Sequence, residues 1–260
     1  MNRKNIILKN IVLPYYKAWN LFFEISLPIS ASLKNRLKSS NKNNFDVLYF
    51  TPIIGLTLGL SAYILSWVIS IIGGTIFASI LCPFLIVLSW ESLNHAKDTS
   101  SLVHYIYLKI FRHYDTDSIE INNNENIYMQ FYIFIAIFMI RVLCLGIFIY
   151  YHHFGWIVIT TVLTYAIQGH LAAEDKKSSG EVLISADSKS LIIMWVITAV
   201  LCVLFGAVYF PMIPAFIITV LLAVKAKSFY EKNNRLSGAS IGFTGKYTEV
   251  IILLLGLLLY

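Results

Sequence analysis

The chain has 260 residues, of which 58% are apolar and only 13% are charged. Soluble domains average about 45–50% apolar and about 25% charged residues, so this chain has too little charge to cover a soluble globule. A disordered tail and a disulfide-rich secreted scaffold are excluded as well, because the chain is strongly apolar and has only three cysteines. The composition therefore predicts a polytopic membrane protein.

The first part of the chain, residues 1–51, is expected to be a cytoplasmic or interfacial segment. Within it, residues 11–31 are apolar and aromatic but are interrupted by two prolines, a lysine and a glutamate. Interruptions of this kind are typical of a helix that lies in the interface or re-enters the membrane. We therefore expect no span before residue 52.

Seven apolar segments follow, with lengths near the requirement for crossing a hydrocarbon core of about 30 Å. They lie at residues 52–72, 75–90, 129–151, 154–169, 190–209, 211–226 and 246–260. The predicted fold class is all-α: a polytopic membrane helix bundle with seven transmembrane helices. We expect one integral membrane domain over residues 1–260, with the bundle at 52–260.

Basic residues are distributed very unevenly over the connections between these segments. Residues 1–51, 91–128, 170–190 and 225–246 hold 8, 3, 3 and 5 of the 20 lysines and arginines, and the other connections hold none. The positive-inside rule then predicts that the N-terminus and the polar face are cytoplasmic, in a protein of the plasma (inner) membrane. With the charge explained in this way, no nucleic-acid partner is expected; the partner is the lipid bilayer.

A polar cluster, Trp90-Glu91-Ser92-Leu93-Asn94-His95-Ala96-Lys97-Asp98, follows the second span. If the helix of that span continues, Glu91, His95 and Asp98 stand at i, i+4 and i+7 and share one face. Two carboxylates and an imidazole at a membrane boundary predict a site for a divalent metal or a phosphate. The alternative is a solvated helix end in which the acids pair with nearby lysines.

The third span contains one basic residue, Arg141. A charge at this depth costs about 2.5–3.5 kcal/mol on insertion scales unless it faces a partner or a cavity. One hypothesis is a phosphate contact, because a guanidinium binds phosphate with two hydrogen bonds. The other is snorkelling or a structural pair with a carboxylate on another helix.

Just before the last span, residues 235–249 contain three glycines, Gly238, Gly242 and Gly245, among small hydroxyl residues. This spacing suits close helix packing or a backbone that approaches a ligand. The three cysteines all fall within apolar runs and are interpreted as small core residues.

Taken in order, these motifs resemble the adenosylcobinamide-GDP ribazoletransferase family, also called cobalamin-5'-phosphate synthase. Phe23-Glu-Ile-Ser-Leu-Pro28 stands where that family has a pattern like F-L-T-R-L-P, and Pro52-Ile-Ile-Gly55-Leu-Thr-Leu-Gly59 is similar to P-L-V-G-L-L-L-G. The cluster from Glu91 to Asp98 corresponds to D-G-L-A-D-x-x-D. Residues 235–249 correspond to R-L-G-G-V-T-G-D-x-x-G-A-x-x-E.

The chain also departs from the family pattern. Asp98 alone of the three signature aspartates is retained, with Glu91 and His95 at the other two positions, and the late aspartate falls at Gly242. The arginine of the opening motif falls at Ser26, and the central D-S-R stretch has no clear equivalent. Arg141 stands where the family tends to have lysine.

The resemblance implies a membrane-bound transferase that joins adenosylcobinamide-GDP and α-ribazole to give adenosylcobalamin and GMP. It implies Mg²⁺ on the acidic cluster, with Glu91, His95 and Asp98 as metal ligands and catalytic residues. A histidine ligand favours Mn²⁺ over Mg²⁺. The implied substrate-binding residues are Arg141, Arg235, Gly238, Ser240 and Gly242.

Two other functions stay open at this stage. The altered acidic positions are consistent with a diverged, catalytically inactive member that binds or scaffolds other proteins. Seven spans and an intramembrane arginine are also consistent with a small transporter. The sequence leaves the oligomeric state open.

Overall fold

A computed structural model describes residues 11–23, 45–111, 123–174, 184–185, 188–206, 211–232 and 237–259. The described elements are helices apart from one pair of two-residue parallel strands, β1 (Ala173–Glu174) and β2 (Ile184–Ser185). Within these described ranges, seven helices are long and apolar enough to cross a membrane, which confirms the predicted number of spans. They are α5 (Thr51–Gly73), α6 (Thr75–Leu93), α8 (Asn123–Tyr150), α9 (Phe154–Ala172), α10 (Ser188–Gly206), α11 (Met212–Lys232) and α12 (Gly238–Leu259).

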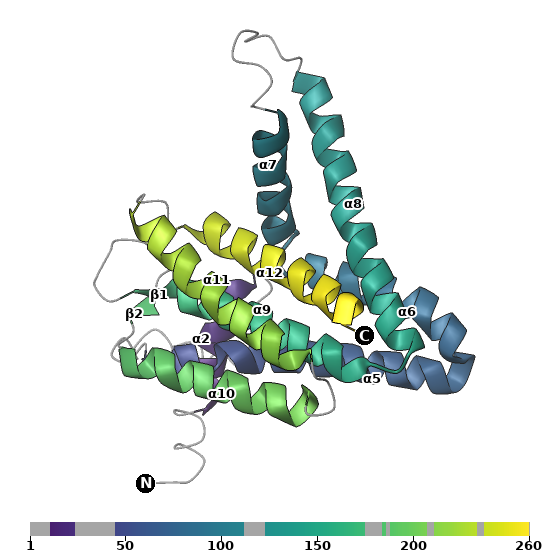
Figure 1. Ribbon diagram of the computed structural model, residues 1–260, viewed down its shortest axis with the longest axis horizontal. Helices are drawn as coiled ribbons and strands as arrows, with labels where there is room; N and C mark the ends of the chain where they lie inside the picture. The colour runs from purple at the N-terminus through teal and green to yellow at the C-terminus, as the bar shows by residue number, and fades with distance from the viewer. Residues whose placement is uncertain are drawn as a thin grey trace, which may run out of the picture.

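The described ranges contain three further helices. Two of them are not candidate spans, and the third is a short helix directly before α5, within which the first candidate span begins at Val47, earlier than the predicted start at residue 52. Helix α2 (Leu13–Phe22) falls inside the segment for which an interfacial or re-entrant helix is predicted, and it packs on α5 and on the short α4 (Phe45–Tyr49). Helix α7 (Lys97–Phe111) lies in a stretch predicted only as a connection. Figure 1 shows α7 and the first part of α8 rising together from the rest of the bundle.

Helix α9 is the centre of the bundle. It packs against α5, α12, α10 and α11, and 89% of its most apolar window is buried, against 17% for α11. Its threonines need no partner from another helix, because Thr160 and Thr164 each donate to the backbone carbonyl four residues earlier. A helix can therefore be buried on all sides even though it contains hydroxyl groups.

Two glycines let α5 approach α9 closely. A Cβ at Gly55 would lie 2.7 Å from the Cα of Val162, and a Cβ at Gly59 would lie 2.7 Å from the Cα of Val158. Backbone atoms cannot move aside as a flexible side chain can. These glycines belong to the motif at residues 52–59, and in this structure they serve helix packing.

The cysteines behave as predicted. Cys82, Cys144 and Cys202 are free thiols on three different helices, and all are buried in the apolar core. A second, smaller core joins α7 to α8 through Leu102, Val103 and Ile137. This packing places the start of α7 against the bundle, where the polar residues gather.

Candidate functional site

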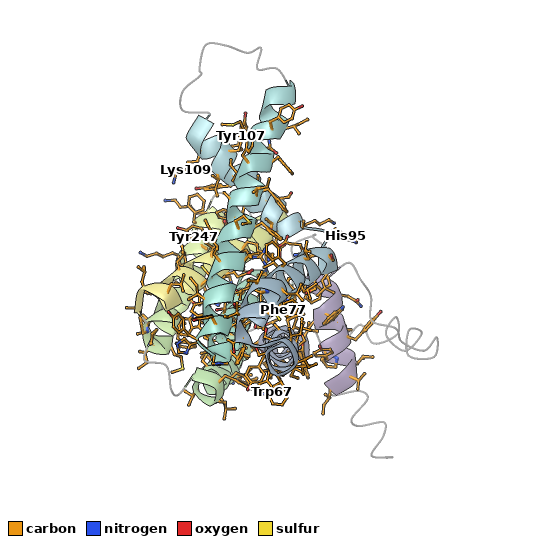
Figure 2. All side chains as sticks on the ribbon, turned by 90° about the vertical axis from the view of Figure 1, so that its right-hand side faces the viewer. Trp67, Phe77, His95, Tyr107, Lys109 and Tyr247 are labelled. Atoms are coloured by element: carbon orange, nitrogen blue, oxygen red, sulfur yellow. The ribbon has the colours of Figure 1, made fainter. Side chains whose placement is uncertain are left out.

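The helix of the second span does not continue to Asp98, so the expected shared face of Glu91, His95 and Asp98 is wrong. Helix α6 ends at Leu93, and the chain turns with positive φ at His95 (51°) and Ala96 (55°). The amide of Ala96 donates to the carbonyl of Glu91 at 2.8 Å and closes the turn. The turn leaves His95 exposed at the edge of the molecule (Figure 2), whereas Glu91 is buried.

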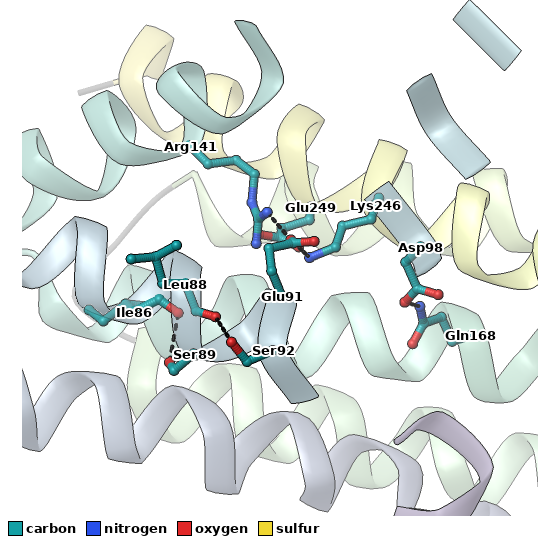
Figure 3. A network of polar contacts seen from close by, with 10 residues as sticks. All are labelled: Ile86, Leu88, Ser89, Glu91, Ser92, Asp98, Arg141, Gln168, Lys246 and Glu249. Carbon is teal, nitrogen blue, oxygen red and sulfur yellow. Dashed lines mark hydrogen bonds and ion pairs between the residues drawn. The ribbon is translucent and has the colours of Figure 1, made fainter. Parts of the chain in front are cut away.

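Glu91 belongs instead to a buried ring of four charges, which we call the charge ring: Glu91, Arg141, Lys246 and Glu249. The Arg141 guanidinium donates through Nη1 to Oε1 of Glu91 and through Nε to Oε1 of Glu249, the latter at 2.7 Å. The Lys246 Nζ lies 3.1 Å from Oε1 of Glu91 and 2.9 Å from Oε2 of Glu249. Positive and negative groups thus alternate around the ring (Figure 3).

The charge ring is electrically neutral and connects three helices. Arg141 comes from α8, Glu91 from the last turn of α6, and Lys246 and Glu249 from α12. None of the four is more than 7% exposed, and Arg141 is fully buried. Of the two hypotheses for Arg141, the structure favours the structural pair, since two of its three guanidinium nitrogens, Nε and Nη1, already bind carboxylates on other helices.

Asp98 lies in the first turn of α7, separate from the charge ring. Its Oδ2 accepts a hydrogen bond of 3.0 Å from Nε2 of Gln168, which lies near the end of α9. Burial raises the pKa of the Asp98 carboxyl, and the nearby Lys246 ammonium and the Gln168 amide oppose that shift only in part. A carboxyl of this kind is suited to exchanging a proton with a ligand.

Asp98 faces a cavity of about 470 Å³ at the end of the bundle. The cavity has an apolar wall from the end of α2 and a polar wall from the α6–α7 turn, the start of α7 and the start of α12. Its lining residues are Asn20, Leu21, Phe22, Phe23, Asn94, Lys97, Asp98, Ser100, Ser101, Gly238 and Ala239. Two smaller cavities of about 50 and 10 Å³ also include Asp98 and Gln168 in their walls.

The structure therefore brings together part of the predicted site. Asp98, Gly238 and Gly242 line these cavities, as expected for one shared polar site. Glu91 and His95 are not among the lining residues of the three cavities. Arg235 and residues 24–28 of the opening motif lie outside the described residues.

The described part of the glycine-containing segment is helical from Gly238 onward and belongs to α12. Ser237 and Ser240 start α12 with a reciprocal cap: the Ser237 amide donates to the Ser240 hydroxyl at 2.8 Å, and the Ser240 amide donates to the Ser237 hydroxyl at 3.3 Å. This is the structural role of Ser240. Gly238 and Gly242 then fall in the first turns of the helix.

The three residues proposed as metal ligands do not form a common coordination site. In the part of the chain that the structure describes, no group of three or more His, Cys, Asp or Glu side chains is arranged to hold a metal ion. Oε1 of Glu91 is bound by Arg141 and Lys246, and His95 is exposed. Magnesium stays a prediction from the resemblance, and these residues do not fit the three-ligand set.

Sequence reasoning missed three residues of this region: Gln168, Lys246 and Glu249. A signal for the last two was present, because a Lys-x-x-Glu pair at i and i+3 inside an apolar span calls for a buried partner. No comparable signal marks Gln168. Comparisons with protein-family models, with curated proteins and with solved structures find no match to this chain.

Proposed function

We propose that the chain is a membrane-bound transferase of the ribazoletransferase type, which joins adenosylcobinamide-GDP to α-ribazole and releases GMP. One observation carries the proposal. Asp98 and the Gly238–Gly242 turn are far apart in the sequence and were singled out by separate motifs, yet they line one polar cavity. A cavity with one apolar and one polar wall at the end of a membrane bundle suits a phosphorylated, amphiphilic substrate.

In the proposed reaction, the ribazole hydroxyl attacks the phosphorus on the cobinamide side of the pyrophosphate. A new phosphorus–oxygen bond forms, the bond to the GMP oxygen breaks, and GMP leaves. Asp98 accepts the proton of the attacking hydroxyl, because its burial raises its pKa toward the pH at which a general base works well. Lys97 and the N-termini of α7 and α12 border the cavity and favour the negative pyrophosphate.

We also propose that the N-terminus and the cavity face the cytoplasm of the inner membrane. Lys97 is the first residue of α7, Lys189 the second residue of α10 and Lys232 the last residue of α11, as the positive-inside rule expects for cytoplasmic helix ends. A single cysteine introduced at the exposed Ser92 would react with a membrane-impermeant maleimide in inverted vesicles. Labelling of this cysteine in right-side-out cells, and not in inverted vesicles, would show the opposite orientation.

The test is turnover by membranes that contain the full chain. We expect conversion of adenosylcobinamide-GDP and α-ribazole to adenosylcobalamin, with one GMP released per product. Reactions with Mg²⁺, with Mn²⁺ and with EDTA show whether a divalent ion is required. Absence of product in all three, with a chain shown to be folded, would overturn the proposal.

A second candidate is a protein that binds the same ligands without catalysis. This candidate is favoured because Glu91 forms ion pairs with Arg141 and Lys246. One of the two carboxylates of the acidic motif is therefore already occupied. Saturable binding of adenosylcobinamide-GDP without turnover would select this function. The transporter hypothesis loses the support of an unpaired intramembrane charge, because Arg141 pairs with two carboxylates.

A further inference from the structure

Gln168 is a polar side chain at the point where the cavity meets the core. It is 2% exposed and comes from α9, the most buried helix of the bundle. Figure 3 shows its amide next to the Asp98 carboxylate, with the hydrogen bond from Nε2 to Oδ2 drawn between them. One end of the amide therefore has a partner.

The other end of the same amide is unsatisfied. Oε1 of Gln168 is buried and has no hydrogen-bond partner among the residues that the structure describes. A buried carbonyl oxygen without a donor is unfavourable, so such an atom usually has a water or ligand partner. Gln168 lines the cavity of about 50 Å³, which is large enough for a hydroxyl-bearing group since a water needs about 10–15 Å³.

Two glycines of α12 provide the space for this pair. A Cβ at Gly242 would lie 2.8 Å from Cγ of Asp98, and a Cβ at Gly245 would lie 2.6 Å from Cδ of Gln168. Both side chains thus rest directly on the α12 backbone. The seating of Asp98 and Gln168 therefore accounts for glycine at positions 242 and 245.

We infer that Gln168 is a binding and positioning residue: its amide nitrogen fixes the Asp98 carboxylate, and its carbonyl oxygen accepts a hydrogen bond from a hydroxyl group in the adjoining cavity. The inference rests on the proposed function, in which this hydroxyl belongs to the acceptor alcohol, α-ribazole. A resident water offers the same hydroxyl chemistry. The experiment must therefore separate a bound alcohol from a bound water.

The first measurement is α-ribazole binding and turnover by the purified full chain. Gln168→Met keeps the side-chain length and removes both hydrogen bonds, and Gln130→Met on α8 is the matched control. We expect Gln168→Met to weaken α-ribazole binding about tenfold or more. In turnover it should raise KM for α-ribazole and lower kcat while leaving KM for adenosylcobinamide-GDP unchanged. If Gln168→Met is active and binds α-ribazole as tightly as the wild type, the partner of Oε1 is a water, and the hydroxyl site is overturned.

The second measurement needs no activity. Gly245→Ala is expected to lower the melting temperature of the wild-type chain, because the new methyl group collides with Gln168. In a Gln168→Ala background the same change should cost much less. Additive losses in this double-mutant cycle would overturn the positioning role. If wild type neither binds nor converts α-ribazole, the proposed function and the hydroxyl site both fail, whereas the cycle still decides whether Gln168 is seated as described.

Discussion

Replacing Arg141 by methionine should destabilise the bundle strongly. The substitution removes both guanidinium contacts of the charge ring and leaves Glu91 and Glu249 with Lys246 as their remaining partner, so the buried site changes from neutral to a net charge of −1. Breaking a buried ion pair by removing one partner costs about 3–5 kcal/mol. We expect a loss of that order in the free energy of unfolding.

The double variant Arg141→Met/Glu249→Gln tests the reason for that loss. It restores neutrality, because Glu91 and Lys246 still form a pair, and the amide oxygen introduced at position 249 can still accept a hydrogen bond from the lysine. We therefore expect the double variant to be more stable than Arg141→Met alone, with a coupling free energy of about 1–3 kcal/mol.

The assay is reversible unfolding in mixed detergent micelles, followed by tryptophan fluorescence. The matched control is Lys227→Met, which breaks the half-exposed Lys227–Glu231 pair, whose nitrogen and oxygen are 3.9 Å apart. A surface pair of this kind contributes about 0–1 kcal/mol. The reasoning is refuted if Arg141→Met lowers the free energy of unfolding no more than this control does. It is also refuted if the losses of Arg141→Met and Glu249→Gln simply add in the double variant.

Three further predictions concern the packing, the pH dependence and the start of α12. Gly55→Ala should destabilise the chain by about 1–3 kcal/mol, because the new Cβ meets the α9 backbone; an unchanged unfolding curve would contradict the close approach of α5 and α9. Because the pKa of Asp98 is raised in the folded chain, the folded state holds more protons than the unfolded state above pH 3.8, so this group's contribution to stability falls as pH rises from there to the raised pKa. Asp98→Asn should remove that fall, and identical pH profiles of unfolding for both chains would refute it. Ser237→Ala should cost about 0.5–2 kcal/mol through loss of the α12 cap, measured by the same unfolding assay.

The spans could be predicted because hydropathy and the spacing of basic residues report on the bilayer itself. Their ends were harder to place. Helix α12 begins at Gly238 instead of residue 246. Its first turns contain glycines, serines and threonines, which are typical of loops, and packing against α7 and α9 stabilises them as a helix. Helix α11 extends to Lys232 because lysines at a helix end can reach the interface.

The site was predicted only in part, for a similar physical reason. Asp98 and Gly238 were identifiable from local motifs. The turn at His95 and Ala96 was not, because it contains neither Gly nor Pro and depends on positive φ at residues that rarely adopt it. The charge ring joins residues on three helices that are distant in the chain, such as Glu91 and Lys246, and a single sequence carries no record of which buried charges meet.

The most direct test of the central claim compares Asp98→Asn with Glu231→Gln in the transfer assay. Glu231 is half-exposed near the end of α11 and is not among the cavity-lining residues, whereas Asp98 lines all three cavities. We predict that Glu231→Gln releases GMP from adenosylcobinamide-GDP at the wild-type rate, and that Asp98→Asn, folded and inserted to the same level, releases it at least about 100-fold more slowly. Equal rates for the two variants would contradict the assignment of this cavity as the reaction site.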